Sequence, residues 1–141
     1  NLSDNPLFAD PNDGDYHLQS QYGRWDPNQR LWINDEVTSP CIDAGDPAAE
    51  WKKELWPHGG RINIGAYGGT AHASMSPNAA GSPIDLNSDG FIDFSDYAVI
   101  VRQWMYDNLS YADPMSGDVS RDGAVNFLDL AAFFEHWLDV I

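Results

Sequence analysis

The chain has 141 residues, and its seven Lys and Arg against 22 Asp and Glu give a formal net charge of -15. Nucleic acids and anionic membrane surfaces are bound by clustered basic residues, and Lys52-Lys53 is the only basic pair here, so both are excluded as partners. The hydrophobic fraction of 43%, with six Trp, six Tyr and six Phe, is too high for a disordered acidic tail. No apolar run approaches the roughly 18 residues that cross a bilayer, so we expect folded domains without membrane insertion.

The N-terminal half is predicted to consist of short strands between turns. Residues 1–74 are rich in turn-forming residues and contain the alternating runs Asp15–Gln19 and Arg61–Tyr67, which favour β-strands. Cys41 is the only cysteine, which excludes an internal disulfide. Residues 75–84 are small and polar with two Pro, a composition typical of a linker between domains.

The C-terminal part contains an internal duplication. Residues 85–96 align with residues 118–129 at an offset of 33. The match continues beyond these segments, because Trp104 corresponds to Trp137. A repeated unit is the simplest account of this pattern.

Each copy has the spacing of a 12-residue calcium loop. Such a loop supplies oxygen ligands from its first, third, fifth, seventh, ninth and twelfth positions and has Gly at the sixth. The predicted ligands are Asp85, Asn87, Asp89, the Phe91 carbonyl, Asp93 and Asp96 in the first loop, and Asp118, Ser120, Asp122, the Ala124 carbonyl, Asn126 and Asp129 in the second. An ordinary Asp-Gly turn is the alternative for one loop alone, but two loops in register gather carboxylates that repel one another without a cation. We therefore predict two Ca2+ sites, the second weaker because Ser120 is a poorer ligand than Asn87 and Arg121 adds a positive charge.

A helix is predicted after each loop. Apolar residues recur at helical spacing in both copies, and we expect the two apolar stripes to bury each other. The stripes are Phe94, Tyr97, Ala98, Val101, Trp104 and Met105 in the first copy, and Phe127, Leu130, Ala131, Phe134, Trp137 and Leu138 in the second. Pro and Gly precede both loops, so no helix is expected to enter them.

Residues 85–138 resemble a dockerin of the duplicated F-hand type, the module that docks bacterial polysaccharide-degrading enzymes onto a cohesin. The Asp-x-Asn-x-Asp-Gly-x-x-Asp-x-x-Asp loop, its looser copy and the missing entering helices carry the resemblance. It implies calcium binding and a cohesin-like receptor as partner. Dockerins often have small hydroxyl residues at the tenth and eleventh loop positions, and here only Ser95 fits that pattern. By the same resemblance, the predicted partner contacts are Ser95, Arg102 and Leu128.

The N-terminal half resembles the C-terminal end of a right-handed parallel β-helix. The resemblance covers residues 4–73 and rests on the segments Asn5–Phe8, Ser39–Asp46 and Gly59–Gly69. Its motifs recur in secreted bacterial proteins, many of them polysaccharide lyases or hydrolases. A solenoid of so few coils lacks neighbours on one side, and the chain opens on Asn1, so we expect a parent protein that continues upstream.

These resemblances predict a mixed fold of two domains. Residues 1–74 would form the all-β end of the β-helix, residues 75–84 the linker, and residues 85–141 a small all-α pair of calcium loop–helix motifs. The predicted function is a calcium-binding assembly or anchoring module of a secreted or cell-surface bacterial protein. That parent would act in polysaccharide breakdown, with a polysaccharide as its own partner.

An alternative places catalysis in the β-helix and leaves the repeats as a stabilising appendage. Glycoside hydrolysis uses paired carboxylates, and Asp35, Glu36, Asp43 and Asp46 are available. Nothing in the sequence sets two of them at a working separation, so acids of surface turns are the favoured interpretation and no catalytic residue is assigned. Whether the chain is an enzyme stays open, with a glycoside hydrolase or polysaccharide lyase as the parent. A structural stalk at the cell surface is a third reading.

Overall fold

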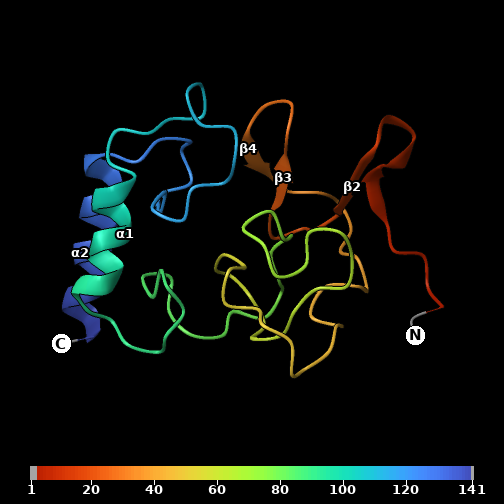
Figure 1. The fold of residues 1–141 in the computed structure, drawn as a ribbon, viewed down its shortest axis with the longest axis horizontal. Coiled ribbons are helices and arrows are strands. Elements are labelled where there is room, and N and C mark those ends of the chain that lie inside the picture. The colour runs from red at the N-terminus through yellow and green to blue at the C-terminus, as the bar shows by residue number, and fades with distance from the viewer. Residues whose placement is uncertain (1–2, 141) are drawn as a thin grey trace.

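The computed structural model describes residues 3–140, which Figure 1 shows as a ribbon. The regular elements are β1 (Phe8–Asp10), the 3-10 turn η1 (Pro11–Asp13), β2 (Asp15–Leu18), β3 (Arg24–Asp26), β4 (Leu31–Ile33), α1 (Phe94–Arg102) and α2 (Phe127–Val140). The strands lie toward one end of the molecule and the helices at the other, with irregular chain between them. Neither described helix has the length and apolar composition that crossing a membrane requires.

The first hairpin joins β1 to β2 through η1. The Asp10 carboxylate accepts a hydrogen bond from the Asp13 amide (3.3 Å), and Gly14, at a φ of 79°, takes the left-handed conformation that ends the turn. Because so short a connection returns the chain beside itself, β1 and β2 pair antiparallel, with Phe8 opposite Leu18.

The second hairpin is closed by the side chain of Asp26. Its carboxylate accepts hydrogen bonds from the amides of Asn28 (2.8 Å) and Gln29 (3.3 Å), an arrangement that reverses the chain. β3 and β4 then pair antiparallel with Trp25 opposite Trp32. The two indole rings meet edge to face at 5.5 Å, a contact that stabilises the pair.

The predicted end of a right-handed parallel β-helix is wrong. Both sheets among the described residues are two-stranded and antiparallel, so no stacked coil forms in residues 3–74. Parallel coils require each strand to pair with a strand one whole coil later in the chain, whereas these strands pair across tight turns. The N-terminal half is instead two hairpins followed by irregular chain.

The predicted strand Arg61–Tyr67 is also wrong. The buried carboxylate of Glu54 accepts hydrogen bonds from the amides of Asn63 and Gly69, both at 2.9 Å. The Ile64 amide and the Ile62 carbonyl bond the backbone of Cys41 and Gly45, which belong to no described strand. Burial raises the pKa of Glu54, and the two hydrogen bonds oppose that rise. The segment is a loop wrapped around one carboxylate.

The segment predicted as a linker is anchored at both ends. The Met75 amide donates to the Gly23 carbonyl at 2.8 Å, and Met75 and Ser76 are buried against the N-terminal region. Ile84, at the other end, is fully buried in the core of the helical part. The domain division drawn from the sequence stays a prediction.

The helices α1 and α2 pack antiparallel, and the duplication is visible in their contacts. The ring of Phe94, which begins α1, has its centroid 5.8 Å from that of Trp137, near the end of α2. The equivalent residues of the other copy, Phe127 and Trp104, have centroids 5.1 Å apart. The two copies therefore contact each other reciprocally, and the helices lie side by side (Figure 1).

The two apolar stripes contact each other but do not bury each other fully, so this expectation is wrong for the residues that head them. Phe94 and Phe127, which head the stripes, are 77% and 74% exposed. The buried face of each helix is led by a carboxylate, because the twelfth loop residue turns inward to bond its own loop. The fully buried side chains of the two helices include Asp96, Ile100, Asp129 and Phe133. Ile100 and Phe133 join Ile84, Met115 and Val125 in the core of the helical part.

Polar contacts join the N-terminal region to the helical part. His72 Nε2 lies 2.9 Å from the Asp113 carboxylate, which belongs to the segment between the two repeats. The Arg121 guanidinium, from the second predicted calcium loop, donates to the Trp56 carbonyl at 2.8 Å. The second loop therefore lies against the N-terminal region.

Candidate metal centre

Both predicted calcium loops fold around the carboxylate of their first residue. In the first loop, Asp85 accepts hydrogen bonds from the amides of Asp89 (3.1 Å) and Gly90 (2.9 Å). In the second loop, Asp118 accepts from the same two loop positions, at 3.2 and 3.0 Å. The first residue of each loop thus fixes the path of the residues that follow it.

The twelfth residue closes each loop from the other side. Asp96 accepts hydrogen bonds from the amides of Asn87 (3.3 Å) and Asp93 (2.9 Å), and Asp129 accepts from the same positions of the second loop, at 2.9 and 2.8 Å. Asp93 is also the N-cap of α1, and Asp96 completes a capping box with it. The last predicted ligands therefore sit at a helix N-terminus, where the helix dipole favours negative charge.

The two loops also share their left-handed backbone positions. The fourth residues, Ser88 and Arg121, have φ values of 56° and 63°, and the sixth residues, Gly90 and Gly123, have values of 88° and 89°. Glycine adopts this conformation without the steric cost that a Cβ brings. A Cβ on Gly123 would also lie 2.9 Å from a methyl group of Leu31. The duplication thus extends to the backbone of the loops.

Three of the predicted ligands are buried carboxylates. Asp96 and Asp129 are 0% exposed and Asp118 is 4% exposed, and none forms a salt bridge with a described Lys, Arg or His. Burial raises the pKa of Asp118 to about 6 and also raises the pKa of Asp96. Burying unpaired carboxylates is costly, and a bound cation removes that cost. The oxygen-only donor set suits a hard cation such as Ca2+.

The carboxylates converge most closely in the second loop. Ligand oxygens of Asp118, Asp122 and Asp129 lie within 4.8 Å of one another, close enough for one cation to contact all three. In the first loop, the amide nitrogen of Asn87 donates to the Asp89 carboxylate at 2.9 Å. The assignment of the ligands in both loops stays a prediction.

Calcium binding at the second loop should weaken as the pH falls below about 6. Calcium needs the deprotonated carboxylate, and the raised pKa of Asp118 lets protons compete at mildly acidic pH. One pH unit below that pKa, about nine-tenths of Asp118 is protonated in the metal-free chain, so the apparent affinity should be about tenfold lower. Calorimetric calcium titrations near neutral pH and at about pH 5 measure this change. An affinity that stays constant over this range would contradict the prediction.

All three predicted partner contacts lie on the exposed surface of the helices. Ser95 is the second residue of α1, Arg102 is its last, and Leu128 is the second residue of α2. A cavity of about 310 Å³ opens between the helices and is lined by Tyr97, Ile100, Val101, Trp104 and Leu130. The helices therefore present an apolar groove as well as these side chains.

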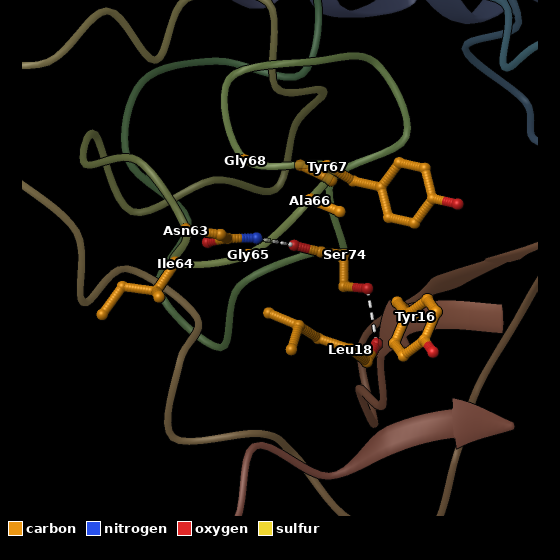
Figure 2. Close-up of a pocket in the computed structure, with 10 residues that line it drawn as sticks. Tyr16, Leu18, Asn63, Ile64, Gly65, Ala66, Tyr67, Gly68 and Ser74 are labelled. Atoms are coloured by element: carbon orange, nitrogen blue, oxygen red, sulfur yellow. Dashed lines mark hydrogen bonds between the residues drawn. The ribbon is translucent and has the colours of Figure 1, made fainter. Parts of the chain in front are cut away.

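A small pocket in the N-terminal region does not resemble a substrate site. It is formed by Tyr16 and Leu18 with residues 63–68 and 73–74, and its volume is about 10 Å³. Figure 2 shows two hydrogen bonds at this pocket, from the side-chain amide of Asn63 to the Ser74 carbonyl (2.8 Å) and from the Ser74 hydroxyl to the Leu18 carbonyl. This volume accommodates about one water molecule.

Two of the acids considered for catalysis hold structural hydrogen bonds. The Arg24 guanidinium donates to both oxygens of Asp35, at 2.9 and 3.0 Å. Asp43 accepts from the Gly59 amide (3.2 Å) and from the Ser76 hydroxyl. Because these bonds connect segments distant in the sequence, both carboxylates stabilise the N-terminal region.

The role of Arg121 in joining the two regions was missed from the sequence. Its guanidinium lies 5.6 Å from the centre of the Trp32 ring, besides donating to the Trp56 carbonyl. A basic residue inside an acidic loop is the signal in the sequence, and it predicts only a charge beside the metal site. The structure makes it a contact residue as well.

Comparison with known families gives two partial matches. Residues 83–136 match the family model of the dockerin type I domain, and residues 1–45 match the family model described as disaggregatase related. No curated protein and no solved structure matches the chain.

Proposed function

We propose that residues 83–136, which match the dockerin type I domain, form a calcium-binding assembly module that anchors the protein to a cohesin-like receptor. The observation that carries the proposal is the pair of loops that repeat one hydrogen-bonding pattern around buried carboxylates. Dockerins bind cohesins. The two copies of the loop–helix unit pack side by side, and their exposed surface is available for docking.

We propose that each loop holds one calcium ion through the ligands predicted from the sequence. The second site is the weaker one, because the positive charge of Arg121 acts on Asp118 and Asp129 and opposes a cation there. The chain's own contribution is to orient the oxygen donors by backbone hydrogen bonds. Bound calcium supplies the positive charge that balances the buried carboxylates.

The receptor is proposed to contact the exposed helix surface around Ser95, Arg102 and Leu128. Phe94 and Phe127 add large exposed apolar side chains to this surface, and an exposed apolar patch of this kind is typical of a binding site. Arg102 supplies a positive charge on a chain whose net charge is -15.

Binding to a panel of immobilised cohesin domains tests this function. The full chain should bind at least one of them in calcium and lose binding in EGTA. Leu128→Ala should weaken that binding about tenfold, because truncating an apolar contact at an interface costs on the order of 1 kcal/mol or more. Leu109→Ala is the matched control, since Leu109 is also exposed but lies between the repeats. Absence of binding to every cohesin, by a chain that binds calcium, would contradict the proposed receptor.

The parent protein is proposed to be a secreted or cell-surface bacterial protein of polysaccharide breakdown. The dockerin type I module supports this setting, since such modules belong to extracellular assemblies. Activity of the purified parent on a panel of acidic and neutral polysaccharides tests the assignment.

A further inference from the structure

The β3–β4 hairpin packs on the second calcium loop and leaves the equivalent position of the first loop open. Gly123, the sixth residue of the second loop, is buried, and a Cβ there would lie 2.9 Å from a methyl group of Leu31 in β4. Gly90, the sixth residue of the first loop, is exposed, and a Cβ there would meet no described atom within 4 Å beyond its chain neighbours. The two loops share one hydrogen-bonding pattern, so they differ in their surroundings and not in their own fold.

The N-terminal region also holds the side chain of the fourth residue of the second loop. The Arg121 guanidinium lies 5.6 Å from the centre of the Trp32 ring, a distance at which an aromatic face attracts a cation, and it donates to the Trp56 carbonyl at 2.8 Å. Among the described residues it forms no salt bridge with a carboxylate. This positive charge is therefore engaged by groups that lie outside the calcium loop.

A further connection runs through the chain between the two repeats. The Asn108 amide donates to the Gly123 carbonyl at 2.8 Å, so this chain pairs with the second loop. The Arg30 guanidinium, from the turn before β4, donates to the carbonyls of Asn108 and Leu109, at 3.4 and 3.2 Å. The hairpin thus supports the second loop directly and also through the segment that pairs with it.

We propose that the β3–β4 hairpin positions the second calcium loop, so that calcium binding in this loop and docking of the hairpin strengthen each other. The inference rests on the calcium binding proposed above. An ion needs several loop oxygens at fixed positions, and a loop held by outside contacts loses less conformational freedom when the ion binds. The coupling is reciprocal, because the affinity that docking adds to the ion is returned by the ion to docking.

The hairpin also restrains a charge that opposes the ion. Released from Trp32, the Arg121 guanidinium would be free to approach the carboxylates of its own loop and would repel calcium there more strongly. Trp32 and Arg30 contact the loop or its paired segment but supply no ligand. They are accordingly positioning residues for the second site.

Calcium titrations of the full chain in two single-site backgrounds test the proposal. Asp96→Asn leaves the second loop to bind calcium, and Asp129→Asn leaves the first. Trp32→Ala should weaken binding about tenfold in the Asp96→Asn background and leave it unchanged in the Asp129→Asn background. Trp32→Phe keeps an aromatic face for Arg121 and should retain most of the affinity. Circular dichroism at saturating calcium establishes that each variant is folded.

Tyr16→Ala is the matched control for the loss of an aromatic side chain. Tyr16 belongs to β2 of the first hairpin and is 46% exposed. In Figure 1, β3 and β4 lie between this hairpin and the helices. Its removal should change calcium binding in neither background, which separates positioning of the second loop from a general loss of stability.

Amide hydrogen exchange measures the coupling from the other side. In the Asp96→Asn background, residues 24–33 should exchange about tenfold more slowly in calcium than in EGTA, and this slowing should be lost in the Asp129→Asn background. If a single-site background does not fold, Trp32→Ala in the otherwise unaltered chain still decides, because only one of the two calcium binding events should weaken.

Two outcomes overturn the coupling while leaving calcium binding in place. They are an unchanged affinity of the second site in the folded Trp32→Ala variant, and an equal loss of affinity at both sites. Absence of calcium binding by the folded, unaltered chain would overturn the calcium sites themselves and the coupling with them. The failure of this inference is therefore distinguishable from the failure of the proposed function.

Discussion

Chelation of calcium by EGTA should lower the free energy of unfolding of the dockerin module by about 4 kcal/mol for each calcium site. This value applies when the free calcium concentration before chelation is about 1,000 times the dissociation constant of the site. The module buries Asp96, Asp118 and Asp129 without a salt bridge to a described Lys, Arg or His, so these carboxylates destabilise it until an ion binds. A domain of this size is marginally stable from burial alone. Urea unfolding followed by far-UV circular dichroism, in calcium and in EGTA, measures the difference. We expect most of the helical signal of α1 and α2 to depend on calcium.

Asp129→Asn separates the metal effect from a general loss of stability. The change removes the buried charge that would contact the ion, so the difference between calcium and EGTA should shrink by the contribution of the second loop, and one binding event should disappear from a calcium titration. Asp4→Asn is the matched control, because Asp4 is exposed and far from either loop in the sequence. Equal stability of the unaltered chain in calcium and EGTA would sink the metal assignment and leave the loops as ordinary turns.

The calcium loops could be predicted from the sequence because their structure is local. Asp85 and Asp96 bond amides within ten residues of themselves, and the same is true of the second copy. The backbone conformation of each loop can therefore be predicted from the 12-residue spacing with Gly at the sixth position. The left-handed conformation of Gly90 and Gly123 follows from the same spacing.

The N-terminal fold could not be predicted in the same way. Alternating runs indicate strands but not which segment pairs with them, and the choice between parallel coils and hairpins depends on that pairing. The run from Arg61 to Tyr67 forms no described strand, because Glu54 takes its Asn63 amide and its remaining backbone bonds go to irregular chain at residues 41 and 45. No pattern of apolar residues reveals a buried carboxylate that replaces a strand neighbour.

The helix faces were mispredicted for a related reason. A count of apolar positions places Phe94 and Phe127 in the core, yet the structure buries Asp96 and Asp129 and exposes those two rings. The twelfth loop residue must reach back to the loop amides, and this requirement fixes the rotation of each helix. The ligand positions thus determine which side chains, such as Phe133 four residues after Asp129, enter the core.

Phe133→Ala should lower the free energy of unfolding of the dockerin module by about 3–5 kcal/mol in calcium, because Phe133 is 0% exposed and its removal leaves a cavity in the core. Phe134→Ala is the matched control at the next position, where the ring is 44% exposed, and it should cost on the order of 1 kcal/mol. Urea unfolding of both variants, with the calcium concentration held fixed, measures the two changes. Equal losses, or a larger loss for Phe134, would mean that the apolar stripe read from the sequence forms the core after all. A larger loss for Phe133→Ala than for Phe134→Ala is expected because the buried Asp129 sets the rotation of α2 and so turns Phe133 into the core.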